Sequence, residues 1–174
     1  LFLPGGWCPW EEGRWSNARD SMVFQDDDGT YYMYYCTSKG TFEENQDGMG
    51  MASSRDLLHW KDEGVTLELN TAKASESPFV VKRGGTYYMF FTDCERGGTG
   101  YAVSSHPLGG WKRRPGGGHI IIPGSVCASE VFQWRGQWYI SYVHWIHPEL
   151  LGVIGFKELF WEPEGFRLGR DLSD

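Results

Sequence analysis

Residues 74–92 read ASESPFVVKRGGTYYMFFT, and this stretch decides the fold. It places one acid, Glu76, before an apolar run, a Gly-Gly turn and a second run rich in aromatic residues. Two runs of β-forming residues around such a turn predict a pair of antiparallel strands. The same plan occurs at Arg19–Tyr35, RDSMVFQDDDGTYYMYY, where Asp20 takes the place of Glu76, and in shorter form at Ser129–Tyr142, SEVFQWRGQWYISY. The chain is therefore built from repeats.

Further strands follow each hairpin, so that a unit of roughly 50 residues holds about four short strands, as in a β-propeller blade. The sequence predicts an all-β fold, a β-propeller, with about three four-stranded blades in one domain. The polar segments Ser38–Gly48 and His144–Leu150 are predicted to be loops between strands. The predicted blades span approximately residues 17–70, 71–124 and 125–174.

Aromatic residues recur at matching places in the three units. Tyr32, Tyr88 and Tyr139 are predicted to be equivalent, and so are Trp60, Trp111 and Trp161. A blade cannot bury both faces by itself, so large rings between neighbouring blades have a structural role first. Sugar binding is the alternative for any one of them.

The composition narrows the classes of partner. The 174 residues carry a net charge of −7 with scattered basic residues, which argues against a nucleic acid or an anionic membrane surface. No apolar run reaches the length of a membrane span, and no signal peptide is visible, so the compartment stays open. Four cysteines lie far apart without a CxxC pair, which predicts buried thiols, with one disulfide possible, and no zinc site.

The first strand of each propeller blade lines the central axis, so residues at the head of that strand converge at one end. Asp20 and Glu76 are predicted to occupy this same position in consecutive blades. Paired carboxylates suit cleavage of a glycosidic bond, in which one protonates the leaving oxygen while another acts as base or nucleophile. The alternative is that the two acids cap turns or pair with Arg19 or Lys82 at the surface.

Three motifs in order resemble those of the five-bladed β-propeller glycoside hydrolases, the superfamily of families 32, 43, 62 and 68. Asn17-Ala18-Arg19-Asp20-Ser21 resembles their Arg-Asp-Pro motif, with Ser21 in place of Pro. Ser75-Glu76-Ser77-Pro78 resembles the Glu-Cys-Pro or Glu-Gly-Pro motif of the general acid, and Ser54–Trp60 the Ser-x-Asp-Leu-x-x-Trp turn of their blades. The resemblance extends from about Asn17 to Trp161.

This resemblance implies that Glu76 is the general acid. It also implies that Asp20 orients substrate hydroxyls, tunes the pKa of the general acid and stabilises the transition state. Arg19 and Asn17 are expected to bind substrate, and Arg19 also to hold Asp20. In these families a third acid, the nucleophile or base, belongs to a preceding blade. The acids that precede Asp20 are Glu11 and Glu12, and neither lies in the family motif, so we expect roughly two N-terminal blades beyond this chain.

Other polar residues have weaker claims to the site. Glu130 aligns with Phe79 rather than with Glu76, but we expect it to reach the funnel and bind a sugar hydroxyl, with a structural role as the alternative. Asp93 is a further candidate for substrate binding. His144 and His147 flank Trp145 without a metal-binding spacing, and they are expected to be solvated loop residues. No cofactor and no metal are predicted.

The expected function is a glycosidase acting on furanosides or xylosides, with a carbohydrate as its partner. The resemblance leaves open β-fructofuranosidase-like action, with retention, and arabinofuranosidase- or xylosidase-like action, with inversion. A non-catalytic carbohydrate-binding propeller or an inactive fragment is the first alternative, and a propeller used for protein interaction is the second.

Overall fold

The computed structural model of the chain describes residues 5–13, 17–41, 44, 46–69, 75–113, 118–147 and 151–173. Within these ranges the regular elements are all β-strands. A helix able to cross a bilayer is therefore not found in the described part of the chain.

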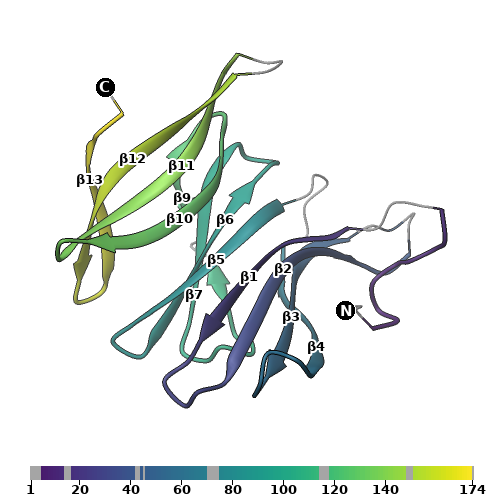
Figure 1. The fold of residues 1–174 in the computed structure, drawn as a ribbon. Helices are drawn as coiled ribbons and strands as arrows, with labels where there is room; N and C mark the ends of the chain where they lie inside the picture. The colour runs from purple at the N-terminus through teal and green to yellow at the C-terminus, as the bar shows by residue number, and fades with distance from the viewer. Residues whose placement is uncertain are drawn as a thin grey trace.

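The strands form three antiparallel sheets that follow one another along the chain (Figure 1). The first sheet contains β1 (Ala18–Gln25), β2 (Tyr31–Lys39), β3 (Gln46–Ser54) and β4 (Trp60–Glu68). The second contains β5 (Ser75–Arg83), β6 (Thr86–Asp93), β7 (Gly98–Ser104) and β8 (Lys112–Arg113), with β9 (Ile120–Pro123) also paired to β7. The third contains β10 (Val126–Trp134), β11 (Gln137–His147), β12 (Leu151–Glu162) and β13 (Gly165–Asp171).

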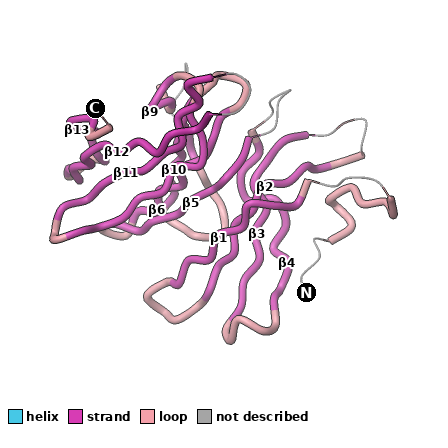
Figure 2. The backbone as a smooth tube through the Cα atoms, turned by 45° about the horizontal axis from the view of Figure 1, so that its top comes forward, coloured by secondary structure: helices cyan, strands magenta, loops and turns pink. Residues whose placement is uncertain are grey.

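The sheets are arranged like neighbouring blades, with β1, β5 and β10 as their inner strands (Figures 1 and 2). β5 contacts both β1 and β10, so the three inner strands lie side by side. Apart from β9, which pairs with β7, the strands of each sheet pair in chain order, as a meander, which is the arrangement expected of a propeller blade. The predicted all-β propeller architecture is confirmed.

Two apolar clusters hold the sheets together, one between each neighbouring pair. Tyr34 and Met51 of the first sheet pack with Met89 of the second, and all three are fully buried. On its other face the second sheet packs Phe90 against Ile140 of the third. Alternate residues of β6 therefore serve opposite neighbours, which explains why its aromatic run is unbroken.

The strand register tests the predicted equivalences. Phe24 pairs with Tyr32, Val81 with Tyr88 and Phe132 with Tyr139, so the three tyrosines are equivalent, as predicted. The equivalence of Trp161 with Trp60 and Trp111 is wrong. Trp60 opens β4 and Trp111 directly precedes β8, so both belong to the fourth strand of a sheet, whereas Trp161 lies on β12, a third strand. The fourth-strand residue of the third sheet is Leu168, which pairs with Leu159 as Trp60 pairs with Ser54.

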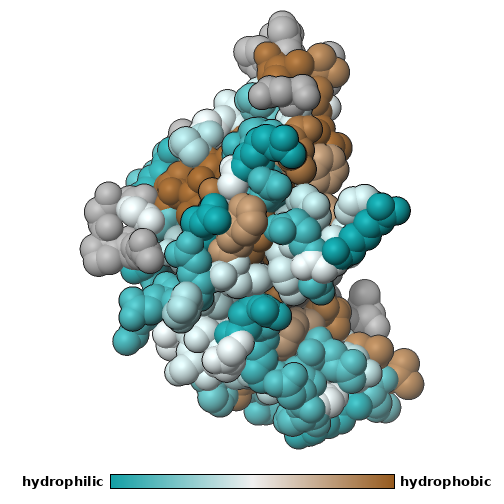
Figure 3. All heavy atoms as spheres, turned by 90° about the vertical axis from the view of Figure 1, so that its left-hand side faces the viewer, coloured by the Kyte–Doolittle hydropathy of each residue, from teal (hydrophilic) through white to brown (hydrophobic). Residues whose placement is uncertain are grey.

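The predicted loop Ser38–Gly48 is shorter than expected, because β2 continues to Lys39 and β3 begins at Gln46. The predicted loop His144–Leu150 is largely wrong, because β11 continues to His147 and β12 begins at Leu151. The long β11–β12 pair leaves apolar side chains exposed on this side of the molecule, where Figure 3 shows hydrophobic surface among polar groups. They include Trp145, Ile146, Leu151 and Ile154.

Candidate active site

The three inner strands share an irregularity at the same place. The pairing of β1 with β2 shifts between Arg19 and Met22, that of β5 with β6 between Glu76 and Phe79, and that of β10 with β11 between Cys127 and Glu130. Each shift is a β-bulge, in which extra residues on one strand oppose fewer on its partner. Bulges change the direction of side chains. The three bulges lie at equivalent positions of neighbouring inner strands, so they redirect side chains at the same end of the three sheets.

Each bulge contains a non-glycine residue in the left-handed backbone region. Asp20 has a φ of 56°, Ser77 of 52° and Ala128 of 51°. This conformation costs an ordinary residue about 1–2 kcal/mol, and such strain is concentrated at functional sites. Repetition of the strain in all three sheets indicates that the bulge is required there.

The register corrects the predicted equivalence of Asp20 and Glu76. Arg19 pairs with Cys36 before the first bulge, and Glu76 pairs with Thr92 before the second. Arg19 is thus the counterpart of Glu76, while Asp20 is the counterpart of Ser77. The two acids differ by one position, and the bulge is the reason that both nevertheless approach the same place.

A pocket of about 200 Å³ opens where the bulges meet, and we call it the bulge pocket. Each inner strand contributes a triplet of consecutive residues, centred on Ser21, Pro78 and Ser129. Asp20 and Glu130 are the two carboxylates that line it. Glu130 pairs with Ser141, as Phe79 pairs with Phe90, which agrees with the predicted alignment of Glu130 with Phe79.

Arg19 joins Asp20, which lines this pocket, to Glu76, which precedes the lining residue Ser77 and is not itself part of the lining. Its Nη1 donates to Asp20 Oδ2 at 2.8 Å, and its Nη2 donates to Glu76 Oε1 at 2.6 Å. The side chains of Arg19, Asp20 and Glu76 are 31%, 31% and 33% exposed, so a ligand can reach all three. Both contacts are charge-assisted hydrogen bonds, which fix the positions of the acids relative to each other. This pairing with Arg19 is also the one that the non-catalytic alternative for the two acids predicts.

Two further groups contact Asp20, and sequence reasoning did not identify either one. Ser77 Oγ donates to Asp20 Oδ2 at 3.3 Å. Cys36 Sγ lies 3.8 Å from the same oxygen, and burial raises the pKa of this thiol to about 12, so it remains a neutral hydrogen-bond donor. Ser77 follows Glu76 in the motif and was within reach of a sequence argument, whereas Cys36 required the strand register.

Asn17 lies beneath the site. It is 5% exposed, its Nδ2 donates to Ser38 Oγ at 3.1 Å, and its Oδ1 accepts from Cys36 Sγ at 3.5 Å. Asn17 therefore supports Cys36, which in turn contacts Asp20.

Asp93 is placed differently from its predicted role in substrate binding. It is fully buried, with its Oδ2 at 2.9 Å from His119 Nε2 and at 3.3 Å from Arg96 Nη1. Burial by itself raises the pKa of the Asp93 carboxyl, but these cationic and hydrogen-bonding partners outweigh burial and hold the pKa below its usual value. The structure corrects the prediction, because a buried carboxylate with these partners fixes the end of β6 and does not face a sugar.

The histidines of β11 and the four cysteines are the other residues considered from the sequence. His144 is exposed on β11, and the side chain of His147 lies outside the described residues. All four cysteines lie within the described residues and are present as thiols, so the disulfide that the sequence left open does not form here. Among the described residues no cluster of three or more His, Cys, Asp or Glu side chains is arranged to hold a metal ion.

Three adjoining sheets whose inner strands lie side by side have the architecture of part of a β-propeller, and Asp20 and Glu76 lie near the heads of the first two inner strands. The profile of Glycosyl hydrolases family 43 matches residues 14–151, and the chain belongs to this family. The predicted family resemblance is therefore confirmed.

Individual relatives support the same class. Residues of this chain are 29% identical over 135 residues to the beta-D-galactofuranosidase xynD of Aspergillus niger, a match that covers 73% of the chain and 37% of that protein. A thermostable family-43 glycoside hydrolase superposes with a TM-score of 0.76 at 21% identity, covering 95% of this chain and 61% of that one. An endo-arabinase from Bacteroides thetaiotaomicron superposes with a TM-score of 0.69 at 22% identity, covering 89% and 55%. The chain thus spans between about a third and two thirds of the length of these relatives.

Proposed function

We propose that this chain forms part of a glycosidase that cleaves furanosides or xylosides, with Glu76 as the general acid. The observation that carries the proposal is the geometry at the bulges, where Arg19 holds Glu76 and Asp20 together beside an open pocket. Two carboxylates and a cation at a pocket edge are suited to an oxocarbenium-like transition state.

In this proposal Glu76 protonates the leaving oxygen of the glycosidic bond. Asp20 stabilises the positive charge that develops on the sugar ring and accepts hydrogen bonds from sugar hydroxyls. Arg19 orients both acids. Glu130 lines the same pocket and is exposed, so it accepts a hydrogen bond from a hydroxyl farther from the bond that breaks.

The contact with Arg19 leaves one carboxyl oxygen of Glu76 for the proton transfer. Arg19 donates to Oε1, and a protonated carboxyl group can accept on one oxygen while it donates from the other. Oε2 is therefore the atom that would carry the proton to the leaving oxygen. The nucleophile or base stays unassigned, because neither Glu11 nor Glu12 lies in the family motif.

The proposed substrate class rests on the names of similar proteins. The similar proteins are named for action on galactofuranosides, arabinofuranosides and xylosides. These sugars share a small neutral ring, which suits a pocket of about 200 Å³. Arabinofuranosides, galactofuranosides and xylosides are accordingly the substrates to test first.

The test measures hydrolysis of aryl arabinofuranoside, galactofuranoside and xyloside by the full-length protein and by its Glu76→Gln variant. Loss of the proton donor should lower kcat/KM about 10³-fold, and least for substrates whose aryl leaving group needs little protonation. The Glu164→Gln variant is the matched control, because it removes an exposed acid from the β12–β13 turn, which is far along the third sheet from the bulge. Equal activity of Glu76→Gln and wild type on every substrate would disprove the assigned role.

A second candidate is a propeller that binds saccharide without cleaving it. The partly exposed side chains of Arg19, Asp20 and Glu76 supply hydrogen-bonding groups for a sugar whether or not a bond is cleaved. Oligosaccharide binding by the wild-type protein without any released product over long incubation would favour this alternative.

A further inference from the structure

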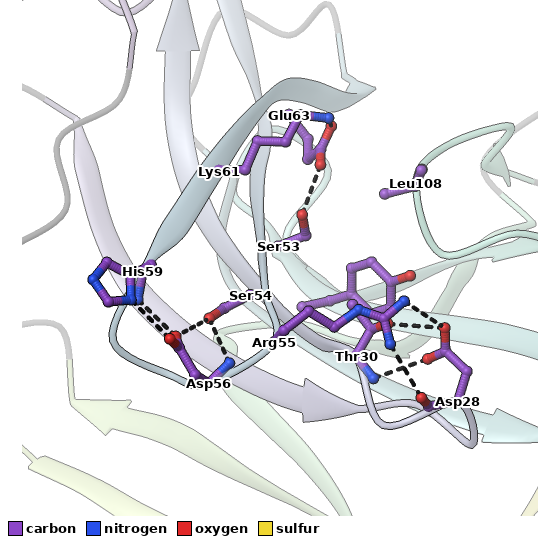
Figure 4. Close-up of a pocket in the computed structure, with 11 residues that line it drawn as sticks. Asp28, Thr30, Ser53, Ser54, Arg55, Asp56, His59, Lys61, Glu63 and Leu108 are labelled. Carbon is purple, nitrogen blue, oxygen red and sulfur yellow. Dashed lines mark hydrogen bonds and ion pairs between the residues drawn. The ribbon is translucent and has the colours of Figure 1, made fainter.

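A second hollow lies at the other end of the first sheet, and we call it the hairpin pocket (Figure 4). Its volume is about 450 Å³, against about 200 Å³ for the bulge pocket, and the two have no lining residue in common. Its walls come from the β1–β2 turn, the β3–β4 turn and strand β4, with Leu108 of the second sheet closing one side. This volume is typical of pockets that take small molecules.

The wall formed by the second sheet is fixed against the first. Thr66 Oγ1 on β4 donates to the Leu108 carbonyl oxygen at 3.0 Å, and Trp111 Nε1 donates to the same hydroxyl at 3.0 Å. Tyr34, buried in the first sheet, donates to the carbonyl oxygen of Pro107 at 3.0 Å. These contacts hold Leu108, whose side chain is 42% exposed, as an apolar surface at the pocket.

The polar walls are also held in place by contacts among themselves. Asp28 accepts from the Thr30 amide and hydroxyl, both at 2.9 Å. On the opposite side, Glu63 accepts from Ser53 Oγ at 2.7 Å and from Lys61 Nζ at 2.9 Å. A pocket whose side chains are positioned before binding loses less entropy when a ligand arrives.

The charges in the pocket select the chemistry of the ligand. Arg55 lies 3.5 Å from Asp28 and Lys61 lies 2.9 Å from Glu63. The third acid of the lining, Asp56, lies 2.7 Å from His59, so each acid already has a basic group beside it. An anion or a cation would find its counter-charge already neutralised. Arg55 and Lys61 still have N–H groups to donate, because their side chains are 72% and 75% exposed, and carboxylates have further lone pairs to accept.

We propose that the hairpin pocket binds a neutral saccharide segment, as an anchoring site separate from the active site. Hydroxyl groups both donate and accept, which matches paired carboxylates and cations, and the C–H face of a sugar ring matches Leu108. The choice of a saccharide as the ligand rests on the proposed function. The site would retain a polysaccharide while the bulge pocket acts on another part of it.

The test measures binding of arabinan, arabinoxylan and polygalacturonate to the full-length protein carrying Glu76→Gln, which prevents cleavage. In this background the double change Arg55→Ala with Lys61→Ala removes two exposed donors from the pocket. The loss of two hydrogen bonds should weaken binding of a neutral polysaccharide about five- to tenfold. Lys112→Ala with Arg170→Ala removes the same charge from exposed positions outside the pocket, and it should leave the affinity unchanged.

Three results would overturn the anchoring site. They are unchanged affinity in the pocket variant, equal weakening in the control variant, and binding of polygalacturonate alone. The outcome is independent of catalysis. Pocket-dependent binding by a wild-type protein that releases no product would contradict the proposed function and support the anchoring site, and cleavage without pocket-dependent binding would do the reverse.

Discussion

Charged side chains join the first and second sheets at both ends of β1 and β5, and the two junctions differ in burial. At the bulge end, Arg19 contacts Asp20 and Glu76, and each side chain is about one third exposed. At the hairpin end, Lys82 Nζ lies 2.5 Å from Asp26, and Tyr87 donates to the same carboxylate at 2.5 Å. Asp26 is only 9% exposed. Both junctions are built from ion pairs between a basic side chain and carboxylates. The bulge-end junction is accessible to a ligand, and the hairpin-end junction is much less accessible.

The difference shows how burial changes the contribution of an ion pair to the stability of the protein. An exposed pair contributes little to stability, typically below about 1 kcal/mol, because water screens it. A buried pair costs much more to break, because one charge is left without a partner in a poorly solvated place. The bulge junction is therefore suited to positioning a ligand, and the hairpin junction to holding the sheets together.

The largest expected effect is that of a substitution at Arg19, which should change activity much more than stability. Arg19→Ala should lower kcat/KM about 100-fold, because both acids lose the group that orients them. Its free energy of unfolding should change by less than about 1 kcal/mol. Arg19→Lys should recover little activity, since an ammonium group cannot bridge two carboxylates as a guanidinium does. Activity on the aryl glycosides and unfolding in urea provide the two measurements, and a large loss of stability with normal activity would reverse the roles.

The converse change is Lys82→Met at the hairpin junction. Asp26, whose side chain is 9% exposed, would keep Tyr87 as its remaining side-chain donor, at an expected cost of about 2 kcal/mol in the free energy of unfolding. Activity per folded molecule should remain near wild type. The exposed pair of Lys39 with Glu68 supplies a control, because Lys39→Met removes a similar charge where both partners are about half exposed. Equal effects of the two lysine variants would show that burial does not distinguish the pairs.

A smaller effect concerns acid pH. Burial alone raises the pKa of Asp26, but the hydrogen bonds from Lys82 and Tyr87 outweigh it and hold the pKa below its ordinary value of 3.8. A lowered folded-state pKa gives stability that is complete above the unfolded-state pKa and is lost as the pH falls through the folded-state pKa. Stability should thus decline below about pH 4. Urea unfolding at a series of pH values should show a shallower decline for Lys82→Met, and parallel curves would exclude Asp26 as a cause.

The smallest effect tests the strain at the bulge end. Ala128 has a φ of 51°, and glycine adopts this conformation without a steric penalty. Relief of the strain, reduced by the flexibility of glycine in the unfolded chain, should stabilise the protein by about 0.5 kcal/mol. Ala102→Gly is the control, because Ala102 lies fully buried in β7 outside the left-handed region, and it should be destabilising. A loss of stability in Ala128→Gly would show that the bulge is not strained.

Much of the architecture can be predicted because it depends on local patterns. The runs around Arg83-Gly84-Gly85 and Arg135-Gly136 indicate hairpins, and β-forming residues on each side indicate strands. The equivalence of Tyr32, Tyr88 and Tyr139 is visible because each follows its turn at a similar spacing. The sequence motifs alone also assign Arg19, Asp20 and Glu76 to one site.

The wrong predictions concern features that a local pattern does not encode. Asp20 aligns with Glu76 by residue type, since both are acids, but the bulge register matches Glu76 with Arg19. The burial of Asp93 depends on His119, which is 26 residues away and comes from the segment before β9. Trp161 is misplaced because β12 is longer than the third strands of the other sheets, so a tryptophan at the expected distance still belongs to the third strand.

The repeated bulge has a consequence for redesign. Asp20, Ser77 and Ala128 occupy one backbone position in three copies, and all three face the same pocket. Asp and Asn tolerate this left-handed conformation better than most residues. A carboxylate or an amide can therefore be introduced at any of the three positions without a change in backbone conformation. The specificity of the pocket can then be changed by one substitution at a time, while the strands that carry these positions stay unchanged.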